Sequence, residues 1–319
     1  MIVFGTAVTE LGKYDRWAKP GIDRVTEPDS VVIAHQSMGT LFKNYNLLLD
    51  LAADYDDLEA LVLLHQDAEI ADDGFCQTIR ASLEDPDVAI VGCAGAIGVR
   101  SIAWWEGAVT WASFTHRYTE IGGGQFDSMT WNPEETPSVC ETGEVDSLDG
   151  FVMVLSPWAV RNLRFDETLG KLHGYDFDIC CQAREAGRKV VTADFRMIHH
   201  HSLDLVSDPD AWMESYIRLA AKWQGRLPHL EPPEGDPEMR ALRSEAENAA
   251  ARAMAMTHQL RYAALERHYL DLVESKSWRL ANRYRAAKVR LARLFGRAPH
   301  PPARPPRAAG PATEPARSD

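Results

Sequence analysis

The sequence predicts an α/β protein built on a mostly parallel β-sheet with helices on both faces, followed by a helical extension and a disordered tail. Three observations support this prediction. Apolar runs typical of strands alternate with helical stretches through residues 1–206, an order that favours a parallel sheet. A length of 319 residues accommodates one such domain of roughly 200 to 250 residues and an additional segment. With 45% hydrophobic and 25% charged residues, the composition is that of a folded globular protein.

Short apolar runs bounded by polar or turn-forming residues mark the expected strands. They lie at 2–8, 30–35, 60–64, 88–91, 151–155 and 189–192. Apolar residues recurring every three or four positions predict helices at 39–53, 73–83 and 176–186, and Gly187 is expected to end the last of them. Residues 100–145 lack clear periodicity and hold several tryptophans, so we expect a loop over a site there.

The predicted domain, residues 1–226, ends after a short helix at 209–223. Residues 227–238 are rich in proline and predict a linker. Apolar residues then keep a 3-4 spacing through 239–275, which is typical of a coiled-coil seam or a long amphipathic helix. Because the seam is rich in alanine, two interpretations stay open: a homodimer through this helix, or a helix packed back on the domain.

The C-terminal part of the chain is basic. Residues 276–298 predict a basic amphipathic helix with aromatic side chains, which either makes a peripheral contact with an anionic membrane surface or caps the fold in solvent. Residues 299–319 are rich in Pro, Ala and Arg and predict a disordered tail.

The formal net charge of −13 is unevenly distributed. Residues 276–319 contain 11 Lys and Arg against 2 Asp and Glu, whereas residues 1–275 contain 23 against 45. Such an acidic body repels nucleic acid, so nucleic-acid binding is excluded as its function. It also needs a basic group or a metal wherever it holds a phosphorylated ligand.

The five cysteines form no Cys-x-x-Cys pair, so neither a zinc ribbon nor a disulfide framework is indicated. No run approaches the ~18 to 20 apolar residues that span a bilayer, and the N-terminus lacks a basic region ahead of an apolar stretch. We therefore expect a cytoplasmic protein, in one interpretation peripheral at the inner face of the membrane.

The most informative stretch is a buried strand that runs into His65-Gln66-Asp67. Ligands of open α/β sheets bind at the carboxyl ends of strands, where these residues lie. His65 and Asp67 are two positions apart on an extended chain, so their side chains face the same way and could address one cation. Imidazole and carboxylate suit Mn²⁺ or Mg²⁺ when a diphosphate supplies further oxygens. A polar strand end without a function is the alternative.

Three further clusters carry side chains suited to chemistry. Acids lead into the strand at 151–155, although Asp149-Gly150 also fits a turn. Asp176 and Asp178 begin a helix, where capping explains one carboxylate and leaves the other for work as a general base. Residues 199–201 form a triple histidine, for which one metal ligand with two bystanders is the simplest interpretation.

These clusters, in this order, resemble the inverting glycosyltransferases of family 2, and more narrowly the branch of glycosyltransferase-like proteins related to a streptomycin-cluster protein. The resemblance covers about residues 1–206 and includes a Leu-Phe-Lys-Asn-Tyr-Asn helix at 41–46. A C-terminal motif of polysaccharide-assembly glycosyltransferases is similar to Ser277-Trp278-Arg279-Leu280 of this chain.

The resemblance implies a GT-A fold, a nucleotide-sugar donor and a glycan, lipid-linked or small-molecule acceptor. Asp67 matches the last acid of an Asp-x-Asp motif that binds the metal, and His65 replaces the first acid. Tyr175-Asp176 matches a Glu-Asp pair, which makes Asp176 the general base and Tyr175 a departure. His200 matches a histidine that completes the metal shell, with His199 and His201 less favoured.

The same resemblance assigns the substrate contacts. Gly5, Thr6 and Ala7 would contact the nucleotide base, and Asp149 and Gly150 would lie near the donor sugar. The acceptor would contact Trp104, Trp105 and Asp178. Because flat aromatic rings stack on sugar faces, the segment with Trp104, Trp105, Trp111 and Trp131 would form a lid over it; ordinary core tryptophans under a loop are the alternative.

Two alternatives to a glycosyltransferase remain at this point. One is a catalytically silent GT-A-like domain that binds a glycan or scaffolds a polysaccharide-assembly system, which the altered Asp-x-Asp and Glu-Asp motifs favour. The other is a metal-dependent hydrolase built on the histidines, although no His-x-x-x-His or similar ligand spacing is present.

Overall fold

The structure, a computed structural model, describes residues 1–102, 107, 109–118, 124–127, 143–201, 208–230 and 237–294. The chain divides into two compact units, Met1–Asp236 and Pro237–Asp319, which are taken separately below. Trp104, Trp105 and Trp131 lie outside the described residues.

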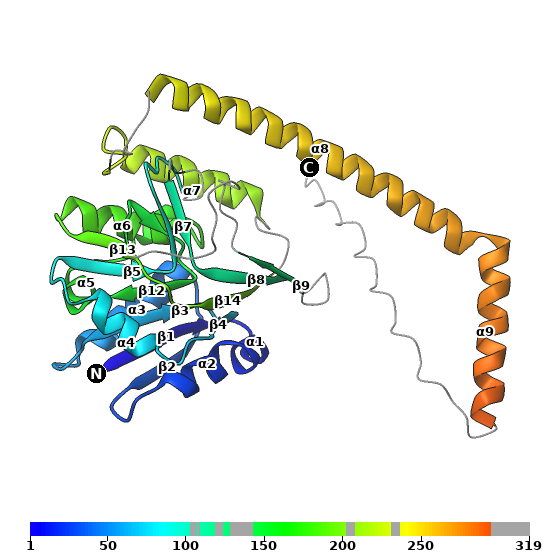
Figure 1. Cartoon of the computed structure of the whole chain (residues 1–319), viewed down its shortest axis with the longest axis horizontal. Coiled ribbons are helices and arrows are strands. Elements are labelled where there is room, and N and C mark those ends of the chain that lie inside the picture. The colour runs from blue at the N-terminus through cyan, green and yellow to red at the C-terminus, as the bar shows by residue number, and fades with distance from the viewer. Residues whose placement is uncertain are drawn as a thin grey trace, which may run out of the picture. The chain divides into compact units, whose positions relative to one another are not determined.

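A seven-stranded sheet with the order β10-β13-β5-β12-β3-β1-β2 forms the centre of the first unit (Figure 1). Its strands are β1 (Ile2–Val8), β2 (Val31–Gln36), β3 (Ala60–Leu64), β5 (Val88–Gly92), β10 (Gly143–Glu144), β12 (Val152–Leu155) and β13 (Lys189–Thr192). Strands β1, β2 and β3 are parallel to one another, and β5 is parallel to β13. The predicted α/β class and the six predicted strands are therefore confirmed, with bounds that agree to within one residue.

Strand β12 departs from the parallel prediction, because it runs antiparallel to both of its neighbours, β3 and β5. Apolar runs of this kind carry no signal for direction, since a strand buried on both faces has the same pattern either way. The reversal has a structural consequence: the first residues of β12 lie beside the last residues of β3, and the amide of His65 donates to the carbonyl of Phe151 at 2.9 Å.

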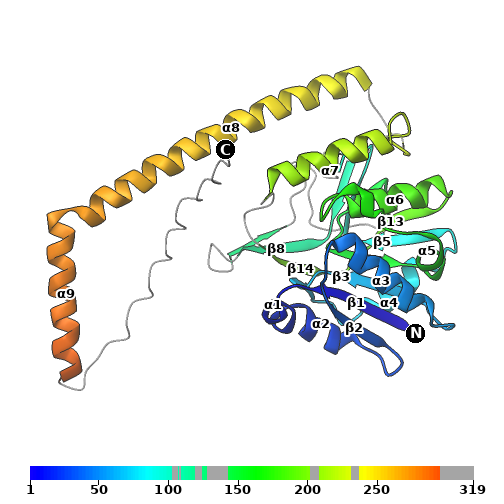
Figure 2. The ribbon, with the colours of Figure 1, turned by 180° about the vertical axis from the view of Figure 1, so that it is seen from behind.

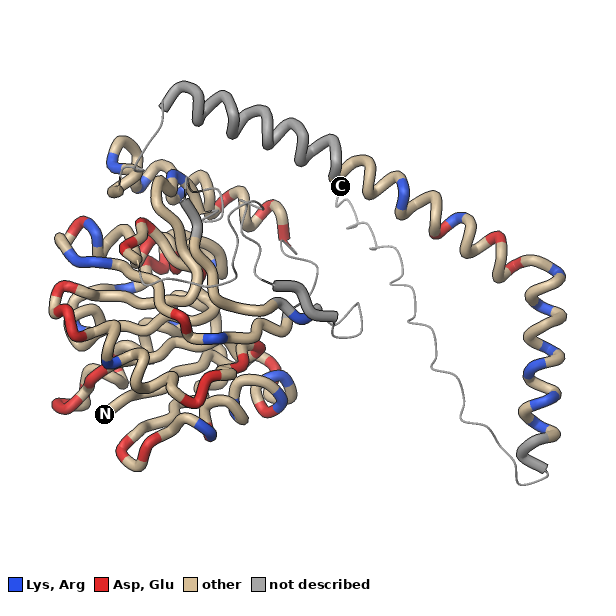
Figure 3. Tube along the Cα trace, viewed as in Figure 1, with Lys and Arg blue, Asp and Glu red and all other residues tan. Residues whose placement is uncertain are grey.

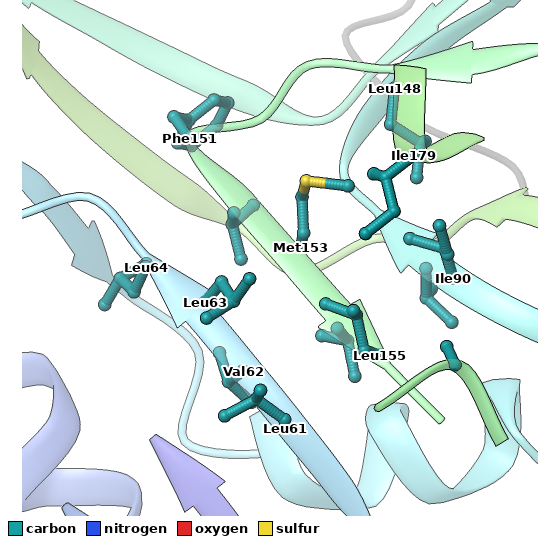
Figure 4. Packing of buried hydrophobic residues seen from close by; sticks show 14 of the residues in the cluster. Leu61, Val62, Leu63, Leu64, Ile90, Leu148, Phe151, Met153, Leu155 and Ile179 are labelled. Carbon is teal, nitrogen blue, oxygen red and sulfur yellow. The ribbon is translucent and has the colours of Figure 1, made fainter. Parts of the chain in front are cut away.

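The core lies around the three middle strands of the large sheet, β5, β12 and β3. Every residue of β3 and β12 is buried, and Figure 4 shows the Met153 side chain directed toward Ile179, with Leu64 and Phe151 toward one end of the two strands. Burial on both faces explains why these strands are continuous apolar runs rather than alternating patterns.

Helices cover both faces of the sheet. An added Cβ at Gly5 would contact Leu48 of α3, whereas the neighbouring Phe4 ring packs near Phe75 of α4, with centroids 6.4 Å apart. Successive strand residues point to opposite faces, so α3 and α4 lie on opposite sides of the sheet, as Figures 1 and 2 show. The helices of this unit are α1 (Leu11–Arg16), α2 (Ala18–Val25), α3 (Leu41–Ala53), α4 (Phe75–Ser82), α5 (Pro157–Asn162), α6 (Tyr175–Glu185) and α7 (Pro209–Lys222), with a 3₁₀ turn, η3 (Glu167–Leu169).

Local signals in the sequence explain where several helices begin and end. The Thr40 and Ser156 hydroxyls accept backbone N–H groups at the starts of α3 and α5, and Asp208 does the same for α7. Gly187, with φ of 73°, follows α6 in the left-handed conformation that ends helices. Helices α1 and α2 were not among the predicted elements.

Two small sheets are formed outside the large one, with the orders β11-β6-β7 and β4-β14-β8-β9. Their strands are β4 (Ala68–Ile70), β6 (Ala94–Ile97), β7 (Val109–Ala112), β8 (Phe114–Tyr118), β9 (Gly124–Asp127), β11 (Ser147–Leu148) and β14 (Met197–His201). Segment 100–145, expected to be a loop, thus contributes strands to both small sheets and to the edge of the large one. Two of these strands pair with distant parts of the chain, β8 with β14 and β10 with β13, which periodicity within the segment does not reveal.

In its described residues, 237–294, the second unit contains two helices, α8 (Pro237–Glu274) and α9 (Lys276–Leu294). Ser275 separates them, and its hydroxyl accepts the Trp278 amide at 3.1 Å at the start of α9. Within the described part of the chain, helices that combine the length and the hydropathy of a bilayer-spanning segment are absent.

Candidate active site

The site begins at the corner between β3 and β4, which consists of His65, Gln66 and Asp67. The Gln66 side chain turns toward the end of β1, where its Oε1 accepts the Thr9 and Glu10 amides at 2.9 Å each. Its amide nitrogen donates to the Thr9 hydroxyl at 2.7 Å. Gln66 therefore fixes the corner to β1, while ligand atoms of His65 and Asp67 come together on the same side, as their spacing predicted.

Strand β14 brings a third ligand to this corner. It pairs antiparallel with β4, with His199 opposite Ala68 and the His200 amide bonded to the Asp67 carbonyl at 2.8 Å. In this register the His199 Nε2 lies 3.6 Å from Asp67 Oδ1. Ligand atoms of His65, Asp67 and His199 all lie within 4.8 Å of one another, which makes this group a candidate cation site.

His200, the residue expected to complete the metal shell, lies elsewhere. Its ring stacks on Trp17 with centroids 3.6 Å apart, and its Nε2 lies 2.7 Å from Glu69 Oε2. Neighbouring residues of a strand point to opposite faces, so the register that directs His199 to Asp67 directs His200 away from it. The structure thus replaces His200 with His199 in the expected ligand set, and the His201 side chain lies outside the described residues.

The electrostatics at the corner suit a cation. Burial by itself would raise the pKa of Asp67, but the neighbouring His199 and His65 rings outweigh it and hold that pKa well below its usual range. Asp67 is therefore ionised at neutral pH. One carboxylate and two imidazoles, all partly buried, form a donor set that fits a divalent cation with positions open to other oxygens.

Tyr175, the first residue of α6, connects this corner to Gly150, which lies shortly before β12. Its hydroxyl lies 2.7 Å from Nε2 of His65. Its ring crosses over Gly150, where an added Cβ would be 2.3 Å from the hydroxyl oxygen. Only glycine at position 150 leaves room for this approach.

Asp176, the expected general base, lies on the other side of Gly150. Its Oδ2 accepts the Gly150 amide at 3.0 Å, and its Oδ1 accepts the Phe177 amide at 2.9 Å. The side chain is partly buried. Burial, followed by the charge of Asp149, raises the pKa of Asp176 to about 7, which is close to the value that suits a general base at neutral pH.

Asp178, expected to contact the acceptor, is instead enclosed in the protein. Its side chain is 1% exposed and binds Lys222 Nζ at 2.8 Å, Trp223 Nε1 at 2.8 Å and Gln182 Nε2 at 2.7 Å. It therefore ties α6 to the end of α7, and it offers no accessible oxygen to an acceptor. Two of its three partners, Lys222 and Trp223, lie more than 40 residues along the chain, so the sequence around Asp178 carried no sign of its burial.

The residues expected to bind the nucleotide are only partly accessible. Gly5 and Thr6 are buried in β1, and Ala7 reaches the surface in part. Asp149 is partly exposed, and its Oδ1 accepts the Phe151 amide at 3.2 Å. Trp111 in β7 is partly buried.

Asp146 is one of the acids that lead into β12, and no role of its own was expected for it. It is 1% exposed, and its two oxygens accept four amides, those of Gly98, Val99, His229 and Leu230. Asp146 thereby joins the loop after β6 to the segment after α7. An acid directly before a short strand gives no such information by itself.

Comparison with known proteins places this site in a family. The model of the glycosyltransferase-like family matches residues 31–210, more than half of the chain and all of the segments that form the cation corner. The streptomycin biosynthesis protein StrF of Streptomyces griseus is 27% identical over 205 residues, which cover 63% of this chain and 67% of StrF. The O-antigen biosynthesis protein RfbC of Myxococcus xanthus is 27% identical over 208 residues, 61% of this chain but only 14% of RfbC.

Two solved structures to which the chain is similar hold a sugar nucleotide or its parts together with Mn²⁺. GalNAc-T7 with UDP, GalNAc and Mn²⁺ covers 77% of this chain and 54% of its own at 11% identity and a TM-score of 0.46. The mannosyltransferase PcManGT of Pyrobaculum calidifontis with GDP-Man and Mn²⁺ covers 92% of this chain and 87% of its own at 12% identity and a TM-score of 0.40. On the extent of the family match, which spans β2 to β14, the chain belongs to the glycosyltransferase-like family.

Proposed function

We propose that this glycosyltransferase moves a sugar from a nucleotide-sugar donor to an acceptor hydroxyl with inversion at the anomeric carbon. His65, Asp67 and His199 would hold a divalent cation, Mn²⁺ or Mg²⁺, and Asp176 would be the general base. One observation carries the proposal: the cation ligands and Asp176 flank the same pair of residues, with Tyr175 bonded to His65 and Gly150 bonded to Asp176.

The acidic character of the body supports a cation in the donor site. Residues 1–275 carry 45 acids against 23 basic residues, so a diphosphate needs a positive charge to bind here. A bound divalent cation would supply it as a Lewis acid that stabilises the leaving nucleoside diphosphate. Asp67 would supply a negative charge, since a carboxylate is ionised at neutral pH, and His65 and His199 would add neutral nitrogen ligands.

Asp176 would act on the acceptor. As the acceptor oxygen forms its bond to the anomeric carbon, the bond from that carbon to the diphosphate oxygen breaks, and the acceptor proton passes to the Asp176 carboxylate. Attack from the side opposite the leaving group inverts the centre. The Gly150 and Phe177 amides hold the carboxylate in place and stabilise its ionised form.

A thermal-shift screen tests the donor and the cation together. We expect one class among UDP-, dTDP- and GDP-sugars to raise the melting temperature, and to do so more strongly with Mn²⁺ or Mg²⁺, because a ligand that binds only the folded state stabilises it. Product analysis by NMR with that donor then reports the anomeric configuration. The absence of a shift with every donor, with and without cation, would favour the catalytically silent scaffold instead.

We also propose that α9 lies on an anionic membrane surface. Leu280, Tyr284 and Leu291 recur at helical spacing, and their side chains are 69%, 73% and 54% exposed. The helix contains Lys and Arg but no Asp or Glu, and in Figure 3 the coloured part of its tube is blue and tan without red. An exposed apolar stripe between basic residues is typical of helices that lie in the interface of an anionic bilayer.

Vesicle binding tests this contact with two variants that change the net charge equally. Arg283→Glu in α9 should weaken sedimentation with phosphatidylserine vesicles by about tenfold or more, since each basic residue near such a surface contributes about 1 kcal/mol. Lys171→Glu, an exposed position in the first unit, should leave binding nearly unchanged. Equal effects of both variants would mean that net charge, and not α9, determines binding.

A further inference from the structure

Tyr175 and His65 occupy the two positions at which this chain departs from the acidic motifs described above. The structure brings these two departures into contact, with 2.7 Å between the tyrosine hydroxyl and Nε2 of His65. Two acids at this distance would repel each other, whereas a phenol and an imidazole form a neutral hydrogen bond. The two residues therefore form a matched pair.

The tyrosine side chain has little freedom to move. It is 6% exposed, and its ring packs among three aromatic rings. The distances between ring centroids are 5.5 Å to Tyr45 and 6.2 Å to Phe42, both edge-on, and 6.1 Å to Phe165. The backbone of Gly150 closes the remaining side. A hydroxyl held in this way by the core presents a fixed hydrogen-bond partner to His65, whose own ring is only partly buried.

We propose that Tyr175 is a positioning residue that orients the His65 ring for the cation and fixes the distance between the cation site and Asp176. The first part follows from the hydrogen bond, because a partner at one ring nitrogen determines the tautomer and the direction of the other. The second part follows from Gly150, which packs against the Tyr175 ring and donates its amide to Asp176. This inference rests on the proposed cation site.

Titration calorimetry of the full chain with Mn²⁺ tests the inference without any substrate. We expect Tyr175→Phe to weaken Mn²⁺ binding by about 10- to 100-fold, the usual effect of losing a partner that orients a metal ligand. Tyr45→Phe is the matched control, since it removes a hydroxyl from the neighbouring buried tyrosine that packs against Tyr175. It should leave the dissociation constant within about threefold.

A double-mutant cycle separates positioning from a general loss of structure. If Tyr175 acts through His65, Tyr175→Phe should have almost no further effect on Mn²⁺ binding once His65 is alanine. NMR of the histidine ring nitrogens in the metal-free protein should also show a changed tautomer signal for His65 in Tyr175→Phe and an unchanged one in Tyr45→Phe.

The outcomes distinguish this inference from the proposed function. Mn²⁺ binding that is the same in the wild type and in Tyr175→Phe overturns the positioning role alone and leaves the cation site standing. Additive effects of the two substitutions overturn it as well. A wild-type protein that binds neither Mn²⁺ nor Mg²⁺ overturns the cation site, and the positioning role with it.

Discussion

Replacing Asp176 by asparagine is expected to lower kcat/KM for sugar transfer by roughly a thousandfold, the usual contribution of a general base. The amide cannot accept the acceptor proton, but it has nearly the same shape and can still accept a backbone amide. Donor binding, measured by thermal shift, should therefore be nearly intact. Asp87→Asn, just before the amino end of β5, is the control and should retain full activity. Substantial transfer by Asp176→Asn would exclude Asp176 as the base.

The pH dependence of kcat/KM is expected to follow the ionisation of Asp176 as well. Burial, followed by the charge of Asp149, raises the pKa of Asp176 from 3.8 to about 7. Because only the ionised carboxylate accepts a proton, kcat/KM of the free enzyme should rise with pH up to about 7 and then level off. Asp176→Asn should lack this titration.

The raised pKa has the opposite effect on stability. The folded protein keeps its proton on Asp176 up to about pH 7, whereas the unfolded chain releases it near 3.8, so this residue's contribution is present at low pH and is lost as the pH rises through 7. At pH 8, Asp176→Asn should therefore unfold with a free energy about 1–3 kcal/mol higher than the wild type, a value reduced for the partial exposure of the carboxylate. At pH 4 the two proteins should be equally stable in urea denaturation.

The second large effect is expected at the cation corner. Asp67→Asn removes the one ionised ligand and should abolish cation binding and lower kcat/KM by roughly a thousandfold, because the leaving diphosphate loses its positive partner. His199→Ala removes one nitrogen ligand and should raise the dissociation constant for Mn²⁺ by about 10- to 100-fold.

His200→Ala is the matched control for His199→Ala. It deletes the neighbouring imidazole, which stacks on Trp17 and bonds Glu69. We expect nearly unchanged Mn²⁺ affinity by calorimetry and a loss of about 1 kcal/mol of stability from the lost stack. If His200→Ala lost the cation and His199→Ala kept it, the ligand assignment would return to His200.

Most of the fold could be predicted because its signals are local. Strands β1, β3 and β13 have the predicted bounds, since each is a short apolar run that must be buried. The direction of β12 could not be predicted, because it depends on the route by which the chain returns from the small sheets. Direction is a property of the topology and leaves no trace in a run of four buried residues.

The site shows the same limit at the scale of single side chains. His65 and Asp67 come together as expected, but they do so at a turn, where the Ala68 amide donates to the His65 carbonyl at 3.1 Å, and not on the extended chain that the expectation assumed. For the triple histidine, alternation implied that His199 and His200 face opposite ways, but which one faces Asp67 depends on the register of β14 against β4. A shift of one residue would have exchanged them. The expectation that Asp178 contacts the acceptor was wrong for a related reason, since its partners Lys222 and Trp223 are distant in sequence.

The reversed strand β12 also bears on the thermodynamics of ligand capture. Because β12 is hydrogen-bonded to β3 on one side and β5 on the other, its first residues are anchored beside His65 before any ligand arrives. His65, Tyr175, Gly150 and Asp176 are thus linked through backbone that is already ordered. Under the proposed function, a cation would immobilise few rotatable bonds and lose little binding free energy to conformational entropy, and Asp176 would already be in place when the donor enters.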